Sequence, residues 1–165
     1  MEKTPSYIKS GPLHRLQGQW MGKGAGSFPT IASFQFEERT SFMHFGNEPF
    51  LRFEQRTWSR SPKEIKVLHW ELGFIVALSE AETRLYTTHM NGRMEVCHGI
   101  CKEEGDAVQF IFESESLRNE EGLAQALKSK RIFTVTGNSL NCRMEMSTSQ
   151  VEEMTHHFQS NLYKV

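Results

Sequence analysis

Every second residue from position 18 to position 26 is glycine or tryptophan, and this pattern constrains the fold more than any other feature of the chain. Gly18, Trp20, Gly22, Gly24 and Gly26 stand two residues apart. Residues two apart share one face of a β-strand, so the pattern predicts a strand with one nearly bare face. It does not match nucleotide-binding glycine loops, because no helical pattern follows. Two explanations remain open: glycine kinks in a tightly coiled barrel strand, or a flat, bulky ligand lying against the bare face.

Most of the remaining chain predicts short strands joined by tight turns. Asn91-Gly92 separates two β-rich runs and is a strong hairpin signal, and Gly137-Asn138 separates two more. Short strands at such regular spacing predict a sandwich or a barrel. We expect one all-β antiparallel barrel, and a barrel of about eight to ten strands can enclose one small ligand.

Two segments depart from the strand pattern. Residues 1–17 form a lead-in with a possible helical turn at residues 12–16. Residues 119–130 place three apolar residues at helical spacing, so they predict either a short helix or a charged loop. We therefore expect little helix and a single barrel domain over residues 18–165.

Composition and charge limit the function classes. The chain has 165 residues, which suits one domain, and 19 basic and 20 acidic residues give a net charge of −1. This balance argues against nucleic acid or a membrane surface as the partner. The longest apolar run, residues 72–78, is too short to span a bilayer, and the N-terminus lacks a secretory signal. Three cysteines do not suggest a disulfide framework, so we expect a cytoplasmic protein.

Two groups of side chains are candidates for metal binding. Cys97, His98 and Cys101 lack both the C-x-x-C-H pattern of covalent haem attachment and the four ligands of structural zinc, so we expect cysteines of the core or of the barrel lining. His156 and His157 are adjacent on the last expected strand and must point to opposite faces. A neutral imidazole inside a dry barrel would be a natural ligand for haem iron. The alternative is a polar strand with surface histidines.

The segment from Gly18 to Ile31 is the most specific of several motifs that occur here in one order. It matches G-x-W-x-G-x-G-x-G-x-Y-P-T-I, with Phe28 at the tyrosine position. Weaker matches follow at residues 34–38, 44–49, 69–74, 92–99 and 154–158. Taken together, these motifs resemble the nitrobindin family of small haem-binding β-barrels. The resemblance runs from Gly18 to the end of the chain and is weakest between about residues 112 and 132.

The resemblance implies a ten-stranded antiparallel barrel, similar to lipocalins and fatty-acid-binding proteins, that holds haem b near one open end. The protein ligand of the iron falls on His157. The bare face of Gly22 and Gly24 would lie against the macrocycle. The other cofactor-binding positions fall on Thr30, Leu68, His69 and Met146.

The choice between the two C-terminal histidines rests on the local motif. The spacing from Met146 to His157 is one residue longer than the family pattern, so a bulge or an insertion is needed. Without a gap the ligand would be His156, and simple burial of its strand face also favours His156 pointing inward. The M-T-x-H match starting at Met154 favours His157, which we expect to be the ligand.

The resemblance also implies a function. Ferric iron in this site would isomerise peroxynitrite to nitrate and bind nitric oxide, with no side chain acting as acid or base and His69 forming a wall. A non-enzymatic haem or nitric-oxide carrier or sensor would use the same site. A haem-free lipid carrier would hold a carboxylate with buried arginine and tyrosine; Tyr163 is present, but no inward arginine partners it in an obvious pattern.

Overall fold

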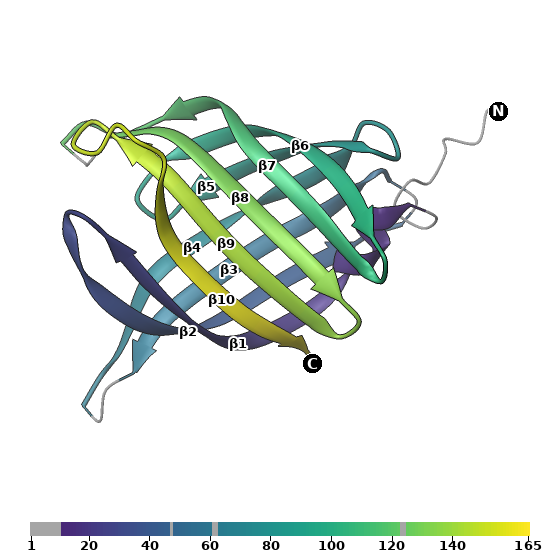
Figure 1. Cartoon of the computed structure of the whole chain (residues 1–165), viewed down its shortest axis with the longest axis horizontal. Coiled ribbons are helices and arrows are strands. Elements are labelled where there is room, and N and C mark those ends of the chain that lie inside the picture. The colour runs from purple at the N-terminus through teal and green to yellow at the C-terminus, as the bar shows by residue number, and fades with distance from the viewer. Residues whose placement is uncertain (1–10, 47, 61–62, 123–124) are drawn as a thin grey trace.

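The structure is a computed structural model that describes residues 11–46, 48–60, 63–122 and 125–165. Within these ranges, ten antiparallel strands close into one barrel in the order β1-β10-β9-β8-β7-β6-β5-β4-β3-β2 (Figure 1). The expected all-β, ten-stranded barrel is confirmed. The strands are β1 (Gly18–Phe28), β2 (Ile31–His44), β3 (Phe50–Arg60), β4 (Ile65–Ala77), β5 (Glu82–His89), β6 (Met94–Glu104), β7 (Ala107–Arg118), β8 (Ala126–Thr136), β9 (Ser139–Thr148) and β10 (Thr155–Lys164).

A short 3₁₀ helix, η1 (Pro12–Leu16), precedes the barrel where the sequence predicted a helical turn. Its Leu13 and Leu16 are buried in the main apolar core. The indole of Trp20 donates a hydrogen bond to the carbonyl of Leu16 at 2.8 Å. The helix therefore packs into one end of the barrel, at the right of Figure 1. No helix in the described part of the chain is long and apolar enough to cross a membrane.

The helix considered for residues 119–130 is wrong for the described residues. Residues 119–122 form a loop and turn, and β8 begins at Ala126. Of the three apolar residues that suggested a helix, Leu123 lies outside the described residues. Leu127 is the extra residue of a bulge between β8 and β9, because Ala126 and the residue after Leu127 pair with consecutive residues of β9. That extra residue breaks the period-two burial pattern by which a strand is recognised.

The two glycine turns lie where the sequence placed them. Asn91-Gly92 joins β5 to β6, and Gly137-Asn138 joins β8 to β9. Gly92 has φ of 87° and Gly137 has φ of 56°. Both values lie in the left-handed region, which glycine adopts without steric cost.

The barrel interior changes character along its axis. On β3, buried Leu51 and Phe53 near the η1 end are followed by buried Gln55 and Thr57. Other strands repeat this change from apolar to polar, and the polar level contains buried Glu38, Glu71, His89, Glu95, Ser129, Arg131 and Ser160. A second apolar cluster of Phe28, Ala126, Met144 and Met146 follows beyond it. An apolar core thus fills the η1 end, and a polar level separates it from the opposite end.

The glycine face of β1 points into the barrel and is covered by its neighbours. A Cβ atom on Gly22 would stand 2.0 Å from a backbone oxygen of β10, so this position needs glycine for the close approach of two strands. Cβ atoms on Gly24 and Gly26 would each stand 2.3 Å from a phenyl ring of β2, belonging to Phe36 and Phe34. The barrel explanation therefore accounts for Gly22. The face expected to be bare is filled by phenyl rings in this structure.

Candidate functional site

A cavity of about 270 Å³ lies at the barrel end opposite η1. Its walls are mostly apolar, and two histidines from different strands contribute to them. Among the described residues the lining consists of Ile31, Phe34, Phe36, Thr57, Leu68, His69, His157 and Phe158. The cavity is thus a concave, largely apolar space with few polar groups, which is the usual character of a small-molecule site.

A β-bulge on β10 turns His157 into this cavity. His156 pairs with Glu145 of β9 and Phe158 pairs with Met144, so His157 is an extra residue between them. The extra residue required by the sequence spacing is therefore present as a bulge. His156 instead lines a hollow on the outer surface. Strict alternation would have turned His156 inward with Phe158, and the bulge is the reason that it does not.

A second bulge, on β4, shapes the facing wall. Thr57 of β3 pairs with His69, and Trp58 pairs with Val67, so Leu68 is the extra residue. Both Leu68 and His69 line the cavity as a result. Bulges commonly re-aim side chains beside binding sites, and here two of them supply residues to one cavity.

The environment of His157 keeps its imidazole uncharged. Burial lowers the pKa of His157 to about 4, and the nearby charges of Arg93, His69 and His156 act in the same direction. The ring packs edge to face against Phe28, with 5.5 Å between ring centroids. Its Nδ1 atom is buried and finds no hydrogen-bond partner among the described residues. A neutral imidazole with an unsatisfied nitrogen is the form in which histidine binds a metal ion.

The residues expected to contact a cofactor are brought together only in part. Leu68 and His69 line the cavity together with His157. Met146 lies in the apolar cluster against which Phe158, a cavity residue, is packed. Met146 therefore supports the wall from behind.

Thr30, Gly22 and Gly24 stand apart from the described lining of the cavity. Thr30 is exposed in the turn between β1 and β2, directly before the cavity residue Ile31. Gly24 lies under the ring of Phe36, which itself forms part of the cavity wall. The ring of Phe36 therefore lies between the glycine face and the cavity.

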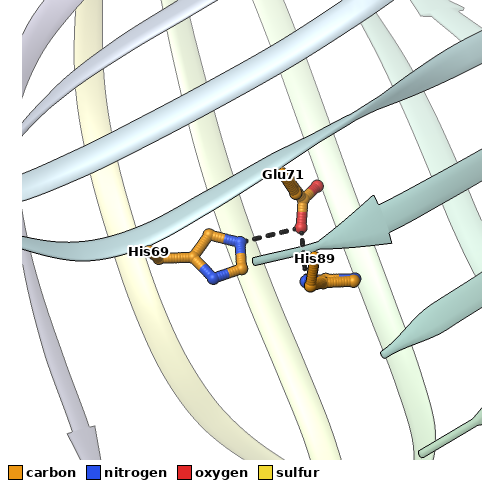
Figure 2. Close-up of side chains that lie close together, drawn as sticks. All are labelled: His69, Glu71 and His89. Carbon is orange, nitrogen blue, oxygen red and sulfur yellow. Dashed lines mark hydrogen bonds and ion pairs between the residues drawn. The ribbon is translucent and has the colours of Figure 1, made fainter. Parts of the chain in front are cut away.

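A buried polar network centred on Glu71 lies behind the cavity wall. Figure 2 shows His69 and His89 both directed at Glu71. Oε2 of Glu71 lies 2.8 Å from Nε2 of His69 and 3.0 Å from Nδ1 of His89. Arg131 donates to both carboxylate oxygens, with Nη2 3.0 Å from Oε2. Three side chains, from β4, β5 and β8, therefore meet at one carboxylate.

The network fixes the charge of its members. Burial by itself would raise the pKa of Glu71, but the charges of Arg131 and His89 outweigh it and hold that pKa well below its usual range. Burial would likewise lower the pKa of His89, yet Glu71 and the nearby carboxylate of Glu95 raise it on balance. The ionised carboxylate of Glu71 thus favours the charged form of the His89 imidazole.

Sequence reasoning gave His69 a place in the pocket wall but gave Glu71, His89 and Arg131 no role. Glu71 follows His69 by two residues, so a shared strand face was a signal available in the sequence. His89 and Arg131 come from other strands, and no local pattern links them to Glu71. The sequence showed no inward arginine that would partner Tyr163 in an obvious pattern, and the one buried arginine of the described residues, Arg131, does not partner it. Both oxygens of Glu71 engage Arg131, and Tyr163 is 62% exposed, so the two do not form a carboxylate site.

The cysteines behave as core residues. Cys97 is buried and Cys101 packs against the main core, and both are free thiols. Burial raises the pKa of Cys97 to about 12 and that of Cys101 to about 11. No group of three potential metal ligands within the described ranges includes a cysteine.

Glu38 is a second buried acid, and its environment is less favourable than that of Glu71. Thr40 and Gln55 both donate to Oε1 of Glu38, at 2.6 and 2.7 Å. Oε2 is buried and makes no well-aligned hydrogen bond within the described part of the chain. Burial raises the pKa of Glu38 above its usual value despite these donors. The ionised form therefore costs folding free energy.

Replacing Glu38 by glutamine should stabilise the protein at alkaline pH. The folded-state pKa lies above the unfolded value, so the cost of ionisation is absent at low pH and appears as pH rises through the folded pKa. Glu38→Gln removes the buried charge and should raise the free energy of unfolding by about 1–3 kcal/mol at pH values above that transition, the scale of the desolvation penalty of a buried polar group. Denaturant unfolding at several pH values measures it. Glu103→Gln, at an exposed position of β6, is the control; a gain that does not depend on pH would contradict the explanation.

A closed antiparallel barrel with a histidine-bearing cavity at one end defines a class of protein, the small ligand-binding β-barrels. Within that class, the chain belongs to the family described as THAP4-like, heme-binding beta-barrel domain, whose model matches residues 9–164. This match confirms the resemblance to nitrobindins found in the sequence.

Individual relatives agree with the family match. The chain is 30% identical over 150 residues to the peroxynitrite isomerase of Nocardia farcinica, covering 91% of this chain and 87% of that protein. It is also 30% identical over 138 residues to peroxynitrite isomerase 1 of Mycobacterium tuberculosis strain H37Rv, covering 81% and 82%. The crystal structure of Rv2717c from M. tuberculosis superimposes with a TM-score of 0.87 over 99% of both chains, at 24% identity. That structure has the same fold.

Proposed function

We propose that the chain binds haem b in the cavity at the open end of the barrel, with His157 as the iron ligand, and isomerises peroxynitrite to nitrate there. Membership of a haem-binding barrel family supports the cofactor. The names of the relatives from Nocardia farcinica and Mycobacterium tuberculosis support the reaction. Haem b, which is held without a covalent bond, fits a sequence that lacks the C-x-x-C-H attachment pattern.

The state of His157 is the observation that carries the proposal. A buried ring nitrogen without a hydrogen-bond partner costs folding free energy unless a ligand satisfies it. The low pKa of His157 leaves the imidazole neutral at neutral pH, so no proton has to be removed before it binds iron. The residues present therefore fit a haem site.

The chain's own residues would hold the cofactor and shield it. Bound haem supplies a ferric iron that acts as a Lewis acid toward peroxynitrite. His157 would bind the iron, and Leu68 and Ile31 would exclude water from the apolar cavity. Glu71 holds Nε2 of His69 at 2.8 Å, so His69 forms a fixed part of the wall and is not proposed as an acid or a base.

The cavity is small, so side chains in its wall must move if a macrocycle is to bind inside it. Its volume of about 270 Å³ lies below the roughly 300–1,000 Å³ of typical ligand pockets. A macrocycle therefore requires the rings of Phe34 and Phe36 to move, or part of the ligand to stay outside the cavity. Movement of the Phe36 ring would uncover Gly24. The proposed contacts are Leu68, His69, Thr30, Met146, Gly22 and Gly24.

Nitric oxide is a further ligand of the same proposed site, and a non-enzymatic haem or nitric-oxide carrier or sensor would use the same residues. A lipid carrier has less support, because the buried Arg131 is already paired with Glu71 and is not free to hold a fatty-acid carboxylate.

A peroxynitrite decay assay tests the reaction. Haem-loaded protein should accelerate the decay and raise the ratio of nitrate to nitrite among the products. Free hemin at the same concentration and haem-free protein are the controls. A decay rate equal to that of free hemin, with an unchanged product ratio, would remove the isomerase activity and leave a carrier or sensor as the function.

A further inference from the structure

We infer that His69, Glu71 and His89 form a binding site for a divalent transition-metal ion such as Zn²⁺, distinct from the proposed iron ligand His157. The potential ligand atoms of these three side chains all lie within 4.8 Å of one another. Figure 2 shows the two imidazoles converging on one carboxylate oxygen. Two imidazoles and one carboxylate are a ligand set that zinc and ferrous iron take in proteins. The inference does not rest on haem binding.

The distances suit a metal ion after a small adjustment. Oε2 of Glu71 lies 2.8 Å from Nε2 of His69 and 3.0 Å from Nδ1 of His89. Bonds of about 2.0–2.2 Å in a tetrahedral site place ligand atoms roughly 3.3 Å apart. These two pairs have to separate by a few tenths of an ångström, and the two histidine nitrogens, which lie within 4.8 Å of each other, have to come to about the same spacing by side-chain rotation.

Outer partners for two of the three ligands, His89 and Glu71, are already present. A metal-bound histidine usually directs its second ring nitrogen at a carboxylate, and a ligating carboxylate is itself hydrogen-bonded. Nε2 of His89 faces Oε1 of Glu95 at 3.3 Å, and Ser129 donates to the other oxygen of Glu95 at 2.9 Å. Arg131 donates to both oxygens of Glu71, and Oε2 also faces the two histidines, so a metal bound at Oε2 would share that oxygen with Arg131. These outer contacts distinguish the cluster from a chance gathering of side chains.

Two arginines lie beside the proposed ligands, and one of them would have to move when a metal binds. Glu71 and Glu95 face the cations Arg131 and Arg93. Nη2 of Arg93 lies 3.2 Å from Nδ1 of His89 and competes with a metal for that nitrogen. The Arg93 side chain is 12% exposed, so it can turn toward solvent when a metal binds.

The cavity provides a route for the ion. His69 lines the cavity, and its side chain is 28% exposed, whereas Glu71 and His89 are buried behind it. An ion that enters from the open end of the barrel therefore meets His69 first and the two deeper ligands next.

Calorimetric titration of the haem-free protein with Zn²⁺ tests the inference. We expect one equivalent of Zn²⁺ to bind to the wild type. His89→Gln and His69→Gln should each weaken binding about 100-fold or more, because each removes a direct ligand. The matched control is His98→Gln. His98 is partly buried on β6, on the strand face opposite to its buried neighbours Cys97 and Gly99, and the variant should bind Zn²⁺ like the wild type. Co²⁺ in place of Zn²⁺ should give a visible spectrum of nitrogen and oxygen ligands that His89→Gln abolishes.

Other outcomes would overturn the inference. No binding to folded wild-type protein, or equal affinity in wild type and His89→Gln, would mean that the network is only structural. Binding lost in His157→Gln but kept in His89→Gln would place the ion beside the proposed haem ligand instead. If His89→Gln does not fold, the partly exposed His69→Gln provides the same test. Because haem is left out, failure of the metal site and failure of the haem site give different results.

Discussion

Hemin added to the purified protein should produce a Soret absorption band that His157→Ala abolishes and His156→Ala preserves. The two histidines are neighbours on β10, yet His157 lines the cavity and His156 lines a hollow on the outer surface. Loss of the protein ligand to the iron should weaken hemin binding by about 100-fold or more, while loss of a surface histidine should leave it unchanged. Absorption titration with hemin measures both.

The paired variants separate several outcomes. Exogenous imidazole should restore the band in His157→Ala, because it can occupy the position left by the missing ring. Loss of the band only in His156→Ala would keep the haem function and contradict the orientation set by the bulge. A wild-type protein without any Soret band would contradict the proposed cofactor, and a barrel without haem would then be the better interpretation.

Arg131→Met should lower the free energy of unfolding by about 3–5 kcal/mol, because it leaves the carboxylate of Glu71 buried without its main cation. A double variant with Glu71→Gln should recover part of the loss, since the uncompensated charge is then gone. Thermal or denaturant unfolding measures the difference. Arg143→Met is the matched control: Arg143 is exposed, pairs with Glu145, and should lose about 1 kcal/mol or less.

The pH dependence of this pair has a defined sign. In the wild type the pKa of Glu71 is well below its unfolded value, so its stabilising effect is present above the unfolded pKa and is lost as pH falls through the folded pKa. In Arg131→Met the unpaired buried Glu71 would instead favour its neutral form. The deficit of the variant should therefore shrink as the pH is lowered. Equal losses of unfolding free energy in Arg131→Met and Arg143→Met would show that the buried ion pair contributes no more to stability than the exposed one.

Local sequence features determined the strand architecture. Alternation of inward and outward residues and the glycines at positive φ in turns, such as Gly92 and Gly137, predicted strands and hairpins because these are short-range properties of the backbone. The motif from Gly18 to Ile31 identified the family, and the local match at Met154 selected His157. The failure at residues 119–130 also has a local cause, since one bulged residue, Leu127, disturbs the alternation.

Only the tertiary structure decided what the interior side chains meet. The bulges at Leu68 and His157 are visible only from the pairing of neighbouring strands, and they determine which residues enter the cavity. The phenyl rings that cover the glycine face come from another strand than the glycines. Glu71, His89 and Arg131 lie on β4, β5 and β8, so closure of the barrel is what makes them one network. A pattern along the chain reports which face a residue occupies, whereas contacts across a barrel depend on the register of all its strands, which local patterns do not contain.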